Sequence, residues 1–133
     1  MTSRSIDLQI SQALILLVES DAGLRRALHV LLMARGYNVK AYAEDTFVRD
    51  YPMGRERTCL IAEHRPTHVD GIKLLRLLRA AGWHHPAILI TTDHSAETER
   101  SALGAGYAHI LRKPFAHHVL VGLVDGALVP RPG

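Results

Sequence analysis

The chain has 133 residues, 47% of them apolar, which is enough for one domain with a hydrophobic core and too few for two. Sixteen Lys and Arg against thirteen Asp and Glu give a net charge of only +3, and the basic residues are scattered, so direct binding to nucleic acid is not expected. The longest aliphatic run, residues 13–18, is far below the roughly 20 residues of a membrane span, and the polar start lacks an apolar signal region, so we expect a cytoplasmic protein with no membrane partner.

The single cysteine, Cys59, lies within an apolar run, so no disulfide can form within the chain and a buried, inert thiol is expected. Nine histidines are present, but none shows the helical two-ligand spacing with a third ligand that a zinc site requires. His64 and His68 are four apart, yet Pro66 between them favours a loop. We interpret the histidines as surface or partly buried side chains.

Short apolar runs alternate with helical patterns about five times along the chain, which is typical of a parallel α/β sheet. Several of these runs are too uniformly apolar to have a solvent-exposed face, so we expect helices on both faces of the sheet. The predicted strands are residues 13–18, 37–42, 58–62, 87–92 and 108–111.

Leucines at helical spacing predict a helix that Gly36 ends in a left-handed conformation and another that Gly82 ends in the same way. A short, weak helix is predicted over residues 44–51, and a polar helix over 96–106 with Ser95 as its N-cap. No linker or repeat interrupts the pattern. The predicted organisation is an N-terminal extension (1–12), one domain (13–129) and a tail (130–133).

The carboxyl ends of the strands are where an open parallel sheet carries its working groups. In this chain they read VESD (18–21), AEHR (62–65), TTDH (91–94) and LRKPF (111–115). Three of them bring acid or hydroxyl groups to one edge and the last brings a lysine. Such a pocket could bind a phosphoryl group and its metal ion.

Four motifs in this order, LILLVESDAGLRRAL, DGIKLLRLLR, ILIT and KPF, resemble the receiver domain of response regulators in two-component signalling, over about residues 13–128. The resemblance implies a flavodoxin-like fold with five parallel strands in the order 2-1-3-4-5 and helices on both faces. It also implies a signal-transduction module of a phosphorelay rather than an enzyme, with a histidine kinase or a downstream regulator as its protein partner.

In that family two acids after the first strand hold Mg²⁺, an aspartate ending the third strand accepts the phosphoryl group, a Thr or Ser follows the fourth strand, and a lysine precedes a proline after the fifth. Spacing assigns these places to Glu19 and Ser20, Glu63, Thr91 and Lys113. Only the hydroxyl and the lysine match the family pattern, so the chain is predicted to be an atypical receiver.

The acceptor position is set by the VDG turn, because the family's acceptor lies seven residues before the aspartate of that turn, here Asp70. The proline expected four residues after the acceptor is displaced to Pro66, with Thr67 in its place, so the loop is expected to run differently. The aromatic switch position in the fifth strand is Ile110, which has no ring to rotate.

These departures weaken the expected chemistry. Ser20 removes one negative charge from the acid pair, so Mg²⁺ binding is expected to be weak or lost, and no other cofactor is expected. Asp21 is expected to lie on the loop or to cap the following helix. Glu63 is longer than aspartate by one methylene, roughly 1.5 Å, and an ångström-scale misplacement can cost an in-line transfer about a hundredfold. Glu63 could imitate a phosphoryl group, be an inert relic, or be phosphorylated by altered chemistry.

The last predicted helix is apolar on almost every side, which indicates an interface if its second stripe is exposed. Val119, Leu120, Leu123 and Ala127 form one stripe, and Val121, Val124 and Leu128 lie off it. Gly122 and Gly126 leave a smooth strip for a close helix contact. We predict a homodimer through the fourth helix, fifth strand and fifth helix; the alternative is that the chain itself covers both stripes, for example with residues 1–12.

Two other classes of protein share parts of this pattern. A flavodoxin-like enzyme or nucleotide-binding module would have the same architecture, but ESDAGL (19–24) is not a glycine-rich phosphate loop. A DNA-binding regulator is the other alternative, because receivers of this family often precede an output domain.

Overall fold

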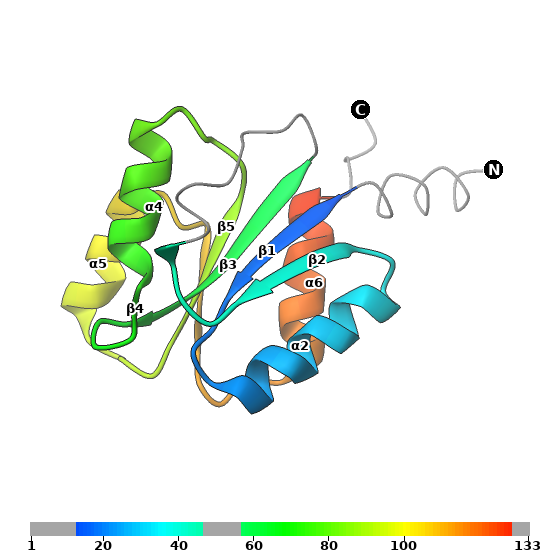
Figure 1. The fold of residues 1–133 in the computed structure, drawn as a ribbon. Helices are drawn as coiled ribbons and strands as arrows, with labels where there is room; N and C mark the ends of the chain where they lie inside the picture. Colours follow the sequence, from blue (N-terminus) through cyan, green and yellow to red (C-terminus); the bar gives the residue numbers. More distant parts are fainter. Residues whose placement is uncertain (1–12, 47–56, 129–133) are drawn as a thin grey trace.

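The computed structural model describes residues 13–46 and 57–128 (Figure 1). Strands and helices alternate over most of the described residues, as the apolar periodicity predicts. Most of the helix predicted over residues 44–51 lies outside the described residues. The elements are β1 (Leu14–Val18), α2 (Ala22–Ala34), β2 (Asn38–Tyr42), β3 (Thr58–Arg65), β4 (Val69–Asp70), α4 (Gly71–Ala80), β5 (Ala87–Thr91), α5 (Ala96–Ala105), β6 (His109–Arg112) and α6 (His117–Leu128).

The main strands pair in parallel in the order β2-β1-β3-β5-β6. Because β5 and β6 are the fourth and fifth predicted strands, the predicted order 2-1-3-4-5 is confirmed. The short strand β4 was not predicted, and it pairs antiparallel with the end of β3. The backbone N–H of His68 donates to the carbonyl of Arg65 at 2.7 Å and closes this hairpin. The segment after Glu63, expected as a polar loop, therefore continues β3 as far as Arg65.

Helices cover both faces of the sheet, which explains why its central strands are apolar at every position. Figure 1 shows α4 and α5 on one face and α2 and α6 on the other. Alternate residues of β1 enter the two core clusters, Leu14, Leu16 and Val18 on the α4 side, Ile15 and Leu17 on the α2 side. Cys59 is fully buried in the second cluster, and burial raises its pKa to about 12, so the expected buried thiol is confirmed.

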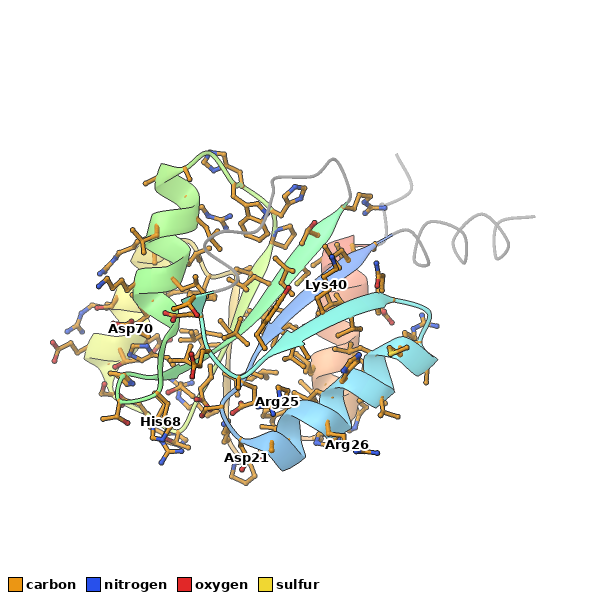
Figure 2. All side chains as sticks on the ribbon, in the orientation of Figure 1. Asp21, Arg25, Arg26, Lys40, His68 and Asp70 are labelled. Carbon is orange, nitrogen blue, oxygen red and sulfur yellow. The ribbon has the colours of Figure 1, made fainter. Side chains whose placement is uncertain are left out.

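The helix ends follow the predicted chemistry. The Asp21 carboxylate caps α2 and the Asp70 carboxylate caps α4, each accepting from the backbone N–H three residues further on, at 2.8 and 3.0 Å (Figure 2). Ser95 caps α5 in the same way at 3.2 Å. Gly36 and Gly82 follow α2 and α4 with φ of 108° and 94°, the left-handed conformation that glycine adopts without strain.

The predicted division of α6 into a buried and an exposed stripe is wrong. Leu120, Val124 and Leu128 are 0%, 0% and 3% exposed and face the sheet, whereas Val119 is 41% exposed. Val124 therefore belongs to the core and cannot lie on an interface. Val121 is half-buried and packs against the same core cluster.

The rotation of α6 about its axis could not be read from its periodicity, because the helix is apolar on nearly all sides. Its one acidic residue fixes the rotation instead. The Asp125 carboxylate accepts a hydrogen bond from the Tyr37 hydroxyl and pairs with Nε of Arg35 at 3.0 Å. Gly122 and Gly126 are exposed, and a Cβ added at either would meet no atom within 4 Å.

None of the helices in the described ranges is long and apolar enough to cross a membrane.

Candidate functional site

The carboxyl ends of four strands bring the predicted site residues to one edge of the sheet. Glu19 directly follows β1, and Glu63 lies in β3 where that strand leaves its pairing with β5. Thr91 ends β5, and Lys113 directly follows β6. All four side chains, with Ser20 beside them, meet at this edge, as the spacing predicts.

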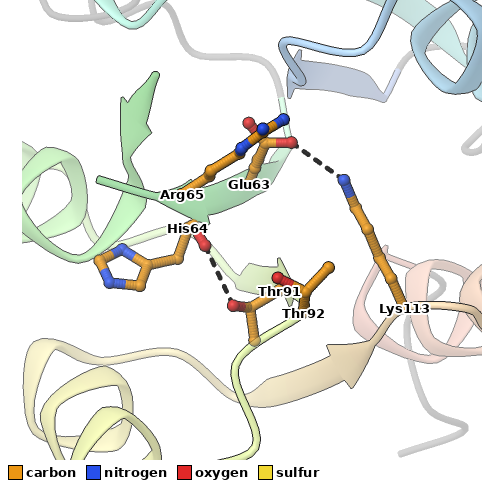
Figure 3. A pocket seen from close by; sticks show the side chains of 6 residues that line it. All are labelled: Glu63, His64, Arg65, Thr91, Thr92 and Lys113. Carbon is orange, nitrogen blue, oxygen red and sulfur yellow. Dashed lines mark hydrogen bonds and ion pairs between the residues drawn. The ribbon is translucent and has the colours of Figure 1, made fainter. Parts of the chain in front are cut away.

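Lys113 lies between two buried carboxylates. Its Nζ is 2.8 Å from Oε1 of Glu19 and 2.9 Å from Oε2 of Glu63, and Figure 3 shows the second contact. Glu19 is 0% and Glu63 is 1% exposed, while the lysine side chain keeps 20% of its surface exposed. Buried carboxylates are tolerated only where an opposite charge and hydrogen bonds compensate them. Lys113 supplies that charge to both.

The remaining carboxylate oxygens are occupied by donors of the β1–α2 loop. The Ser20 hydroxyl donates to Oε1 of Glu63 at 2.5 Å, and the backbone N–H of Asp21 donates to Oε2 of Glu19 at 3.0 Å. Oε1 of Glu19 accepts no hydrogen bond from the described residues and faces the ammonium of Lys113. Each of the four oxygens therefore has a donor or a cation from the chain itself.

The two carboxyl groups titrate in opposite directions. Burial, and then the neighbouring carboxyl of Glu63, raise the pKa of Glu19 to about 7. Burial alone would also raise the pKa of Glu63, but its hydrogen bonds with Glu19, Ser20 and Lys113 outweigh burial and lower it to about 2. The two acids hold the pKa of Lys113 above its usual value despite burial. Near neutral pH, Glu63 is thus the ionised partner of the lysine, and Glu19 holds a proton part of the time.

Thr91 is at the site, but its hydroxyl is turned toward the backbone. It donates to the carbonyl of His64 and accepts from the N–H of Asp93, both at 3.0 Å, and Figure 3 shows the first bond. A cavity of about 290 Å³ opens at this edge of the sheet. Its lining is strongly polar: Glu63, His64, Arg65, Thr91, Thr92 and Lys113.

Two residues that support the site were missed by the sequence analysis. A Cβ on Gly71 would lie 2.4 Å from the carbonyl oxygen of Glu63, so only glycine allows α4 to start this close to β3. Tyr107 is 2% exposed, and its hydroxyl donates to the carbonyl of Gly71 at 2.6 Å. The glycine of the VDG turn could have been recognised as a close approach, whereas nothing in the sequence signals the tyrosine's partner.

Ile110 occupies the place that the resemblance gives to an aromatic switch. It is half-buried and packs against the core cluster on the α4 side. An aliphatic side chain in this position has no ring that could turn between an inward and an outward orientation.

The residues at this edge do not fit the Mg²⁺ ion that the receiver fold implies. Mg²⁺ needs near-octahedral oxygen ligands and keeps its waters unless carboxylates hold it. The Glu19 and Glu63 oxygens already face Lys113, Ser20 or a backbone N–H, and the Asp21 carboxylate is directed to the start of α2. Within residues 13–46 and 57–128, no group of three or more potential ligand side chains could hold a metal ion.

Similarity to known proteins defines the family. A family model described as the response regulator receiver domain matches residues 15–125. The chain therefore belongs to the receiver domain family of two-component signalling, as the four motifs predict.

Among curated proteins, the chain is 25% identical over 114 residues to the transcriptional regulatory protein FixJ of Bradyrhizobium diazoefficiens, covering 86% of this chain and 56% of that protein. It is 34% identical over 123 residues to the response regulator MprA of Mycolicibacterium vanbaalenii, covering 86% of this chain and 49% of that protein. The chain thus spans about half the length of the curated relatives it matches.

Among solved structures, a response regulator receiver protein from Pseudomonas putida has a TM-score of 0.78 at 26% identity, covering 86% of this chain and 97% of that one. Full-length FixJ from B. japonicum has a TM-score of 0.76 at 25% identity, covering 86% of this chain and 56% of that one. These similarities confirm the receiver fold and its signalling class.

Proposed function

We propose that this chain is an atypical receiver that acts through protein–protein contacts and is not switched by phosphorylation at position 63. The observation that carries the proposal is the occupied pocket. The Glu63 carboxylate is buried, ionised, and bound by Lys113 at 2.9 Å and by the Ser20 hydroxyl. A negative charge at the acceptor place already engages the lysine, so the receiver rests in one arrangement.

Glu63 would imitate a phosphoryl group only in part. It carries one negative charge, against about two for a phosphoryl group. It also leaves the Thr91 hydroxyl bonded to the backbone carbonyl of His64. We therefore expect a fixed resting state set by the Glu63–Lys113 pair, without the full rearrangement that a doubly charged group would drive. The protein partner would be a histidine kinase or a downstream regulator, and no enzymatic activity is proposed.

A phosphorylation assay tests this proposal. The natural chain and a Ser20→Asp/Glu63→Asp double variant are incubated with acetyl phosphate and Mg²⁺, and intact mass is measured. We expect the mass of one phosphoryl group on the double variant alone, because it restores the family's acid pair and acceptor. Thr91 and Lys113 are unchanged in both proteins and serve as the shared background. Stable phosphorylation of Glu63 in the natural chain would refute the proposal and favour altered acceptor chemistry.

We further propose that the chain forms a homodimer through α5, β6 and α6. Leu103 on α5 and Val119 on α6 are 52% and 41% exposed, and the glycine strip of Gly122 and Gly126 is open beside Val119. Val119→Glu should make the protein monomeric in sedimentation velocity without changing its circular dichroism. Leu77→Glu, on α4 and 42% exposed, is the matched control and should leave the dimer intact. If both variants stay dimeric, a different face is used.

A second candidate is that the chain is the receiver part of a DNA-binding regulator. It is favoured by the half-length coverage of relatives that include a transcriptional regulatory protein. Immunoblotting of the native host with an antibody against this chain would give the length of the natural polypeptide. A band near 14.7 kDa would argue against this candidate, and a band about twice as large would support it.

A further inference from the structure

The Thr91 hydroxyl makes one hydrogen bond as a donor and one as an acceptor, both with backbone groups. It donates to the carbonyl of His64 and accepts from the backbone N–H of Asp93, both at 3.0 Å, and Figure 3 shows the first bond. A hydroxyl has one proton to donate, so Thr91 could donate to a group in the cavity only by leaving the His64 carbonyl. A turn of the side chain about χ1 would also take the acceptor away from the Asp93 N–H. The position of the Asp93 backbone is therefore coupled to the orientation of this hydroxyl.

The Asp93 backbone is in turn held by its own carboxylate. Oδ1 accepts from the backbone N–H of Ser95 at 2.8 Å, and Oδ2 accepts from the Thr98 hydroxyl at 2.6 Å. The bond from Thr98, and then that from Ser95, lower the pKa of Asp93 to about 2, so the carboxylate is an ionised acceptor at neutral pH. Ser95 itself caps α5 by accepting from the Thr98 N–H. One exposed carboxylate thus ties the loop between β5 and α5 to the first turn of α5 at two points.

We propose that Asp93 is a positioning residue whose carboxylate keeps the Thr91 hydroxyl on the His64 carbonyl and away from the cavity. The inference rests on the proposed function, because it adds a second cause of the single resting arrangement beside the pair of Glu63 and Lys113. It also separates two steps. Restoring aspartates at positions 20 and 63 would restore a phosphoryl acceptor, but the Thr91 side chain would stay where it is as long as Asp93 holds the loop.

Three substitutions separate the bonds of Asp93 from its charge. Asp93→Ala keeps the backbone N–H that Thr91 accepts from and removes both anchors to α5; because the side chain is exposed, the variant should fold. Asp93→Asn keeps an oxygen for the Ser95 N–H and places an amide beside the Thr98 hydroxyl, which can also accept, so it should restore the arrangement. Glu97→Ala is the matched control, because it removes an exposed acid from the same first turn of α5 and leaves the bonds of Asp93 in place.

The experiment is nuclear magnetic resonance of the purified full chain. Three-bond couplings to the γ-carbon of Thr91 give its χ1 angle, and the amide exchange rate at position 93, corrected for the intrinsic rate, reports the bond to the Thr91 hydroxyl. The natural chain, Asp93→Asn and Glu97→Ala should show one Thr91 rotamer. Asp93→Ala should show averaged couplings, and the amide at position 93 should exchange about tenfold faster.

A second set of spectra follows the Ser20→Asp/Glu63→Asp variant before and after treatment with acetyl phosphate and Mg²⁺. With Asp93 present, the Thr91 couplings should be the same in both states. With Asp93→Ala added, the couplings should change when the protein is phosphorylated.

Three results would overturn the inference. A single Thr91 rotamer in Asp93→Ala would mean that the carboxylate does not hold the hydroxyl, and equal averaging in Glu97→Ala would mean that any charge lost from this helix end releases it. The third is a change of the Thr91 couplings in the phosphorylated double variant that still has Asp93. The first two need no phosphorylation, so they decide the role of Asp93 even if stable phosphorylation of Glu63 refutes the proposed function.

Discussion

One cationic side chain binds several acceptors at each end of the sheet, but the acceptors are carboxyl groups at one end and backbone carbonyls at the other. At the carboxyl end, Lys113 contacts the carboxyl groups of Glu19 and Glu63, both buried. At the amino end, Arg79 of α4 donates to three neutral carbonyls at 2.7 to 3.2 Å, and its guanidinium lies 5.5 Å from the ring centroid of Trp83. A carbonyl that loses its donor is still uncharged, whereas a buried carboxylate that loses its cation keeps an uncompensated negative charge. The carboxyl end should therefore respond strongly to pH and to loss of its cation, and the amino end weakly.

Removing the cation at the carboxyl end should have the largest effect. Lys113→Met leaves two buried acids unpaired, and breaking a buried ion pair typically costs about 3–5 kcal/mol of unfolding free energy. Urea denaturation at pH 7 without divalent ions measures this loss. Adding Glu63→Gln should recover part of it, because Glu63 is the acid that is ionised at pH 7 and its unpaired charge is removed. Additive losses in the double variant would show that the two side chains do not interact.

The pH dependence of stability should be the next largest effect. The pKa of Glu19 is raised from 4.5 to about 7, so between these pH values the folded state binds more protons than the unfolded state. The free energy of unfolding therefore falls by ~3 kcal/mol as pH rises from 4.5 to 7. Glu63 has a lowered pKa, so its contribution to the free energy of unfolding is present above pH 4.5 and is lost as pH falls toward 2. The two effects together place maximal stability near pH 4.5.

Urea denaturation between pH 4.5 and 7.5 checks this prediction. Glu19→Gln should flatten the curve in this interval, because the variant has no carboxyl group at position 19 to titrate. A natural chain and variant with parallel curves would contradict the raised pKa of Glu19.

The positions of the site residues were predictable from the sequence, but their interactions were not. The apolar strands and the KPF and VDG motifs place Glu19, Glu63 and Lys113 at one edge, because parallel strands end together. Spacing cannot say that one ammonium reaches both acids or that the Thr91 hydroxyl bonds a backbone carbonyl, because these depend on rotamers. The prediction of which side of α6 is buried failed for a similar reason. The rotation of this helix is set by the contacts of Asp125 with Tyr37 and Arg35, which are far away in the sequence.

Removing the cation at the amino end should cost less. Arg79→Met leaves the carbonyls of Trp83, His85 and Gly106 without this donor, at the edge of the molecule where water can replace it. We expect a loss of about 2 kcal/mol that becomes smaller as pH falls toward 5, because burial and then Arg79 lower the pKa of His85, and removing Arg79 lets that imidazole accept a proton more easily. Urea unfolding followed by the fluorescence of Trp83, the only tryptophan, measures it. A loss as large as that of Lys113→Met would mean that position in the fold, and not acceptor charge, decides the cost.

Thr91→Val should give the smallest effect and separates charge from location. Thr91 is as buried as the two acids at the carboxyl end, with 1% of its surface exposed, but it is neutral. The variant keeps the shape of the side chain and removes the hydrogen bonds to His64 and Asp93. We therefore expect the free energy of unfolding to fall by about 1 kcal/mol, independently of pH. Thr91→Ser keeps the hydroxyl and should lose less. If Thr91→Val matched Lys113→Met, burial at this edge would account for its sensitivity. A small, pH-independent loss would leave the paired charges as the cause.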